Sequence, residues 1–182
     1  MSCDKYKLDG EIKYCDVPVN GVKSMILISK ADYVGVVNST QPDEFNIVTA
    51  ITLAGSKKGY KVHDGRFSTP YEGSEFGHED SPYGSMTPKT IQFEILNNGA
   101  EGARDVMKLG SEYVAVLELT NGEFEVVGTQ NMLTITDKSR ILTGSEQLGW
   151  LVTMSCTELS AGVFLYDTDY DTTLSTYEAL TT

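Results

Sequence analysis

The sequence has few of the residues from which disulfide frameworks, zinc sites and histidine-based catalysts are built. Its 182 residues include three cysteines and two histidines. Cys3, Cys15 and Cys156 are odd in number and show neither a Cys-x-x-Cys spacing nor a Cys/His pattern, so a disulfide framework and a zinc site are both disfavoured. Such sparse thiols are typical of a reducing compartment. We therefore predict no metal ion and no cofactor.

The sequence also lacks a pattern that would assemble a catalytic centre. His63 ends a short strand-like run and His78 lies among glycines and acids, so neither has a neighbour that would activate it. Cys156 falls in an apolar run, which favours an inert buried thiol. Residues 54–59 lack the spacing of a P-loop, and residues 73–77 misplace the serine of a nucleophile elbow. We predict no catalytic residues and no enzyme.

Basic residues and long apolar runs are scarce as well. Fourteen Lys and Arg residues stand against 26 Asp and Glu residues, which gives a formal charge of −12. DNA and anionic lipid are bound by clustered basic side chains, so neither is expected as a specific partner. No run approaches the roughly 20 apolar residues of a membrane span. Residues 1–16 are charged where a signal peptide needs an apolar run, which predicts a protein that stays in the compartment where it is made.

Strand signals dominate, because β-branched and aromatic residues recur in short runs between Gly, Asn, Asp and Pro. Ile91, Phe93 and Ile95 alternate with polar neighbours, as in a half-buried strand. Asn121-Gly122 separates two further runs and predicts a type I′ hairpin. The predicted strands are residues 24–29, 33–37, 46–53, 89–95, 113–119, 123–127, 132–136, 149–156 and 163–166.

This pattern predicts a mainly β fold, a β-sandwich or barrel of about eight strands. One short helix is predicted over residues 100–109, where apolar side chains share a face. No internal repeat or linker divides the chain, so residues 1–182 are predicted to form a single β-rich domain.

Residues 69–89 interrupt the pattern with prolines, glycines, acids and aromatics that follow no period. Connections longer than about 12–15 residues are either functional or disordered, so a long extended loop is predicted here. Its aromatics favour an arm that contacts a partner, because disordered linkers are usually poor in aromatics. The candidate interface residues are Tyr71, Glu72, Phe76 and Tyr83. A disordered loop remains the alternative.

Residues 167–182 are predicted to form an acidic, mobile tail. Asp167, Asp169 and Asp171 alternate as the first ligands of a calcium loop do, and Glu178 stands at the twelfth position. The sixth position of such a loop requires glycine but holds Thr172, and a strand precedes the segment where a helix is expected. A calcium-responsive domain therefore ranks last among the hypotheses.

The second half of the chain resembles structural proteins of tailed bacteriophages, particularly tail-tube and tail-ring subunits. The resemblance rests on an ordered pattern of segments rather than on a diagnostic motif. Those segments are residues 90–95, 106–110, 113–116, 124–128, 132–133 and 148–158.

The resemblance implies a tail-tube-like sandwich or barrel whose copies form a cyclic homo-oligomer, a hexamer or larger. It further implies neighbouring tail or connector proteins as partners, a location in the virion after synthesis in the host cytoplasm, and a channel that DNA crosses without specific binding. Residues 69–89 would reach the adjacent ring, and the negative charge of the chain would suit the channel. The alternative hypothesis is a monomeric β-sandwich binding module for carbohydrate or protein, which would use exposed aromatics such as Tyr71, Tyr83 and Tyr166.

Overall fold

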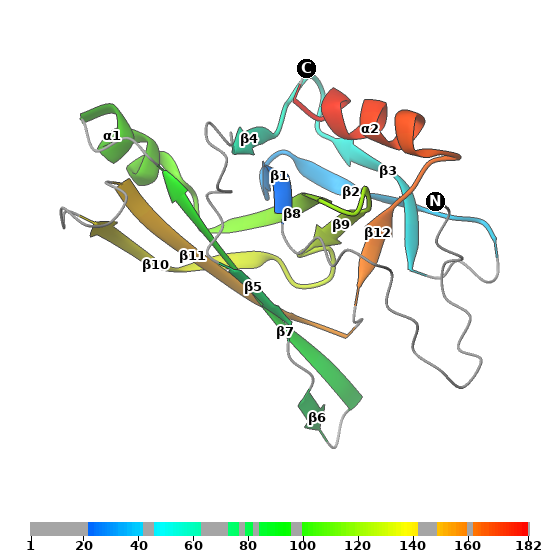
Figure 1. Cartoon of the computed structure of the whole chain (residues 1–182), viewed down its shortest axis with the longest axis horizontal. Helices are drawn as coiled ribbons and strands as arrows, with labels where there is room; N and C mark the ends of the chain where they lie inside the picture. The colour runs from blue at the N-terminus through cyan, green and yellow to red at the C-terminus, as the bar shows by residue number, and fades with distance from the viewer. Residues whose placement is uncertain are drawn as a thin grey trace.

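A computed structural model describes residues 22–41, 46–62, 73–76, 79–81, 84–95, 100–141, 149–159 and 162–181. Twelve strands and two helices lie in these residues, and the mainly β fold expected from the sequence is confirmed (Figure 1). The strands form one hydrogen-bonded sheet that is not closed into a barrel. It bends at one corner into two parts, which we call the first sheet and the second sheet.

The first sheet contains the best-buried strands of the molecule. Its order is β4 (Tyr60–Val62), β1 (Val22–Ser29), β8 (Glu112–Leu119), β9 (Phe124–Val127), β12 (Val163–Leu165), β3 (Ile47–Leu53) and β2 (Tyr33–Asn38). All neighbours pair antiparallel except β12 and β3, which are parallel. The second sheet has the order β10 (Leu133–Ile141), β11 (Gly149–Glu158), β7 (Gly84–Ile95) and β5 (Gly73–Phe76), and β6 (Glu79–Ser81) pairs with the first residues of β7. The corner forms where Leu133 and Thr134 of β10 pair with Tyr113 and Glu112 of β8.

The central strands of the first sheet, β1, β8 and β9, are buried on both faces because their alternate residues enter two different cores. In β8, Tyr113, Ala115 and Leu117 face the second sheet and pack with Phe93 and Met154. Each buried aliphatic or aromatic side chain contributes roughly 1.5–3 kcal/mol, so these faces dominate the stability of the fold.

The opposite face of the first sheet is covered by helix α2 (Tyr170–Ala179), and β2 and β3, at one end of the same sheet, add side chains to the core beneath it. Val114 and Val116 of β8 enter this second core, together with Tyr177 and Leu180 at the end of the helix. Figure 1 shows α2, in red and orange, lying across the sheet beside β3. Helix α1 (Ala100–Lys108), which the sequence predicts, lies at the far end of β10 and β11.

The acidic tail predicted over residues 167–182 is therefore corrected to a helix that completes a core. Asp169 is the N-cap, and its carboxylate accepts a hydrogen bond from the Thr172 backbone N–H at 2.8 Å. The hydroxyl of the buried Tyr177 lies 2.7 Å from Ser24 Oγ, which also donates to Glu118 Oε2 at 2.7 Å. These contacts fix the helix on the sheet despite its weak helix-forming sequence.

The turn between β8 and β9 lies where the sequence predicts it but is of a different type. Only Gly122 has a positive φ, of 84°, whereas a type I′ turn needs positive φ at both central positions. The Gly122 N–H donates to Leu119 O at 3.0 Å, and the Leu119 N–H donates to Glu123 O at 2.8 Å. The loop is a three-residue connection that ends with glycine in the left-handed region.

A second left-handed glycine gives a direct test of the packing. Gly128 has φ of 93°, and an added Cβ would lie 2.9 Å from Tyr113 O, whereas Gly55 has φ of 59° with open space around it. We expect Gly55→Ala to cost about 1 kcal/mol for the backbone conformation alone. Gly128→Ala should cost about 1–3 kcal/mol more because of overpacking. Urea unfolding of both variants measures the difference, and equal losses would contradict the close approach at Gly128.

Candidate functional site

The segment predicted as a loop over residues 69–89 contains paired strands. β5 pairs with the middle of β7, from Gly73 opposite Gln92 to Phe76 opposite Lys89, and β6 pairs with the start of β7. The loop prediction is therefore wrong for β5 and β6. Sequence reasoning missed these strands because they are only four and three residues long and show no apolar alternation. Figure 1 shows β6 and the start of β7 projecting away from the rest of the molecule.

The structure describes one of the four candidate interface residues. Phe76 ends strand β5, at the margin of the second sheet. Tyr71, Glu72 and Tyr83 lie outside the described residues, as do His63 and His78. The structure therefore describes the backbone of β5, β6 and β7 in this segment, with three of the four predicted interface residues outside the described part of the chain.

The sheets end in strands that pair on one side only. Among the described strands, β2 pairs only with β3, and β5 pairs only with β7. β2 carries two exposed apolar side chains, Val34 at 62% and Val37 at 49% of full exposure. An unpaired edge with exposed valines offers both backbone hydrogen bonds and apolar surface to another strand.

An aromatic pocket of about 540 Å³ opens beside the N-terminal end of α2. It is lined by Asn46, Ile47, Gly122, Glu123, Phe124, Phe164, Leu165, Tyr166, Tyr170 and Thr173. Tyr166, expected to be exposed, lies in this lining with 45% exposure, and Tyr170 with 42%. The ring centroids of Tyr170 and Phe124 are 5.9 Å apart. Sequence reasoning missed Tyr170 because it assigned this region to a tail.

The possible calcium ligands do not converge. Asp169 caps α2, while Glu178 lies nine residues further along the same helix, at the other end. At a rise of about 1.5 Å per residue the two carboxylates are too far apart to share an ion. Among the residues that the structure describes, no group of three or more His, Cys, Asp and Glu side chains is placed to hold a metal ion.

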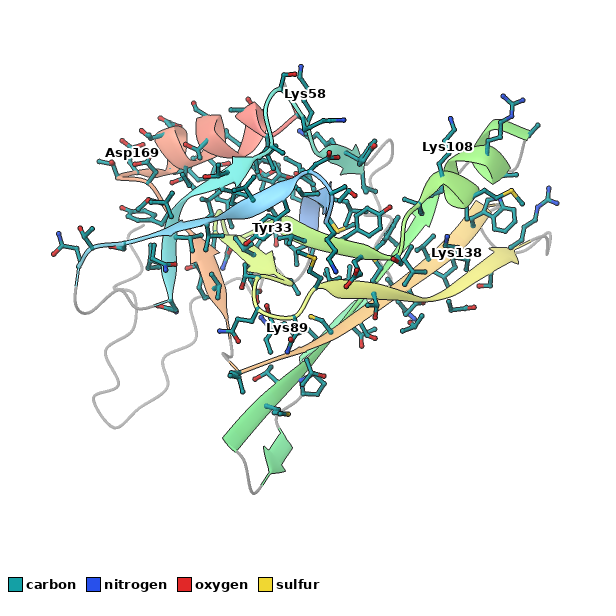
Figure 2. The ribbon with its side chains drawn as sticks, turned by 180° about the vertical axis from the view of Figure 1, so that it is seen from behind. Tyr33, Lys58, Lys89, Lys108, Lys138 and Asp169 are labelled. Atoms are coloured by element: carbon teal, nitrogen blue, oxygen red, sulfur yellow. The ribbon has the colours of Figure 1, made fainter. Side chains whose placement is uncertain are left out.

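A charge cluster of Lys89, Glu125 and Glu158 is buried at one end of the core between the sheets. Lys89 on β7 and Glu158 at the end of β11 are both 0% exposed, and Glu125 on β9 is 6% exposed. Lys89 Nζ lies 3.0 Å from Glu158 Oε2 and 3.4 Å from Glu125 Oε1. Figure 2 labels Lys89, which the sequence placed at the end of a loop.

Backbone amides hold the second oxygen of Glu158. Its Oε1 accepts hydrogen bonds from the N–H groups of Gly128, Thr129 and Gln130 at 3.0, 2.9 and 3.4 Å, and from Thr129 Oγ1 at 3.3 Å. The positive φ of Gly128 lets successive N–H groups converge on one atom, as in an anion-binding nest. We refer to these donors as the Glu158 cradle.

Burial governs the acid–base behaviour of the cluster. Desolvation raises the pKa of Glu125 and outweighs the opposing effect of the Lys89 ammonium, while the negative charges of Glu158 and Glu123 add to the rise. Burial also raises the pKa of the neighbouring Cys156 to about 12, which keeps it a thiol at neutral pH.

The strand periodicity contains the signal that would have found the cluster. Lys89 shares its strand face with Ile91 and Phe93, and Glu158 continues the face of Val152 and Met154, all of which are buried. The sequence signal for this site is therefore a charged residue on the face of a strand that is otherwise occupied by apolar residues.

In comparisons with known proteins, no family model, no curated protein and no solved structure matches the chain. Neither helix in the described part of the chain is long and apolar enough to cross a membrane.

The raised pKa of Glu125 predicts a pH dependence of stability. Its ordinary value is 4.5, so the folded protein holds this proton more tightly than the unfolded chain does. That stabilisation is complete below pH 4.5 and is lost as the pH rises through the folded pKa. The loss amounts to about 1.4 kcal/mol for each pH unit that separates the folded pKa from the unfolded pKa.

Substitution of Glu125 by its neutral isostere tests this dependence. Glu125→Gln should remove the decline from the free energies of unfolding that urea curves give between pH 4 and 8. Glu178→Gln, the same change at an exposed site, should retain it. Identical pH profiles for wild type and Glu125→Gln would contradict the assignment.

Proposed function

We propose that the chain is a structural subunit that assembles with copies of itself into a ring or tube of a bacteriophage tail or connector. The observation that carries this proposal is the open sheet, whose described end strands β2 and β5 each have one unpaired side. Cyclic assembly pairs such edges with one another and leaves none exposed.

The surface of β2 supports edge pairing between subunits. Val34 and Val37 would gain burial when a neighbouring strand is added, and the backbone groups on that side would gain hydrogen bonds. Monomeric proteins usually protect an edge of this kind with charges, prolines or bulges. β2 has register shifts between Tyr33 and Gly35 and between Val37 and Asn38, but residues 33–38 contain neither a charge nor a proline.

The projecting hairpin and the charge suit the same role. β6 and the start of β7 extend beyond the body of the fold, where they would contact the adjacent ring. The formal charge of −12 would keep DNA from adhering to the channel during passage. In this role the protein resides in the virion after synthesis in the host cytoplasm and contacts neighbouring tail or connector proteins.

A charged substitution on β2 tests the assembly. Val34→Lys should raise the protein concentration needed for rings or tubes roughly tenfold or more. A loss of about 1.4 kcal/mol of binding free energy at each contact between subunits corresponds to a tenfold weaker association. Met107→Lys is the matched control, since Met107 on α1 is 82% exposed and lies away from the sheet edges. Light scattering after size-exclusion chromatography, with electron microscopy, measures assembly. A wild-type protein that stays monomeric at every concentration would refute the proposal.

The aromatic pocket favours a second candidate, a binding module for carbohydrate. Sugars stack on exposed tyrosine rings and hydrogen bond to nearby polar groups, and Tyr166, Tyr170 and Glu123 provide both in one pocket. Under this hypothesis a glycan array should show binding that Tyr166→Ala abolishes. Tyr60→Ala, at a tyrosine with 61% exposure on β4, should leave binding unchanged. Absence of glycan binding by the wild type would remove this candidate.

A further inference from the structure

The buried charge cluster places an amine against a carboxyl group in a site without solvent. Lys89 Nζ lies 3.0 Å from Glu158 Oε2, an oxygen bonded to the carboxyl carbon Cδ that the amine would attack. Among the described residues Oε2 accepts no hydrogen bond, so Nζ stands beside it without hydrogen-bond geometry. An ordinary buried ion pair would be expected to satisfy that oxygen.

We propose that Lys89 and Glu158 form an intramolecular isopeptide bond, which the folded chain makes by itself with Glu125 as the proton carrier. This inference is independent of the proposed assembly, because it concerns three side chains inside one subunit.

The reaction balances without any other reactant. Glu125 Oε1, 3.4 Å from Nζ, accepts one proton from the Lys89 ammonium. The freed electron pair forms the Nζ–Cδ bond, and the Cδ–Oε2 bond of Glu158 breaks. Oε2 leaves as water with the two protons that nitrogen loses, one of them delivered by Glu125. An ammonium and a carboxylate thus become an amide and one water, and Glu125 returns to its starting state.

The Glu158 cradle is placed to stabilise the intermediate of this reaction. Attack on Cδ puts negative charge on Oε1, and the N–H groups of Gly128 and Thr129 already point at that atom from 3.0 and 2.9 Å. Donors at about 2.7–3.1 Å define an oxyanion hole. The same contacts polarise the carboxyl group before attack, so the cradle acts on the oxygen that is retained in the amide.

Burial favours the product over the reactants. Lys89 and Glu158 are fully buried, so the charged pair has lost its hydration, whereas the amide carries no charge. Glu125 serves as proton carrier because it lies within reach of Nζ and because desolvation raises its pKa, which strengthens its hold on a proton taken from Lys89.

The mass of the purified full-length protein tests the proposal. We expect the intact mass, measured under denaturing conditions, to be one water lower than the sequence mass. Trypsin should fail to cut after Lys89 and should yield residues 67–104 joined to residues 141–182, since neither segment contains another internal Lys or Arg. A full sequence mass with free peptides ending at Lys89 would overturn the proposal.

Variants assign the roles and exclude another source of water loss. Lys89→Met should show the full variant mass, a result that can be read even if this variant does not fold. Glu125→Gln should accumulate the linked form at least tenfold more slowly than wild type, whereas Glu178→Gln should match wild type; equal rates would overturn the role of Glu125.

Aspartate before glycine can also lose water, at Asp9-Gly10 or Asp64-Gly65. Water loss mapped to those peptides, with Lys89 cleaved, would count against the bond.

Discussion

The structure depends on the burial of strand β8 from both sides. Its residues alternate between the core shared with the second sheet and the core covered by α2, and six consecutive residues from Tyr113 to Glu118 are buried. Every other layer is positioned by this strand, because β1 and β9 pair along its two edges and β10 joins it at the corner. Since the apolar contacts are divided between two cores, neither layer can be removed without exposing half of the strand.

Charged groups accompany this burial in two places, and they are paired in different ways. Glu118, on β8, accepts hydrogen bonds from Ser24 and from the Lys23 ammonium, so its charge is anchored beside the helix. The cluster of Lys89, Glu125 and Glu158 has one cation for two carboxyl groups, and burial leaves Glu125 with a raised pKa. The first arrangement ties α2 to the sheet. The second has one more carboxyl group than cations, and desolvation favours the protonated form of Glu125.

Much of the fold could be predicted from local patterns. The run of apolar residues in β8, the alternation in β7 and the turn at Gly122 indicated the main strands, and α1 was found where its apolar residues share a face. Helix α2 could not be found in this way, because Thr172, Thr173 and Thr176 are poor helix formers and the helix exists through its cap and the burial of Tyr177. Of the candidate site, Tyr166 was identified as an exposed aromatic. Lys89 was placed where the predicted loop 69–89 meets the predicted strand 89–95, and its role was missed because its partners Glu125 and Glu158 are distant in sequence.

The position of α2 along the chain has a consequence for synthesis. The helix follows all twelve described strands, yet Tyr177 and Leu180 fill the core on one face of the first sheet. While the ribosome releases the chain from its N-terminal end, Ile26, Val114 and Val116 therefore lack the cover of α2 on that face until this helix emerges. A nascent chain stalled before residue 170 would present this apolar sheet face to chaperones, and the complete fold is reached only after translation has passed it.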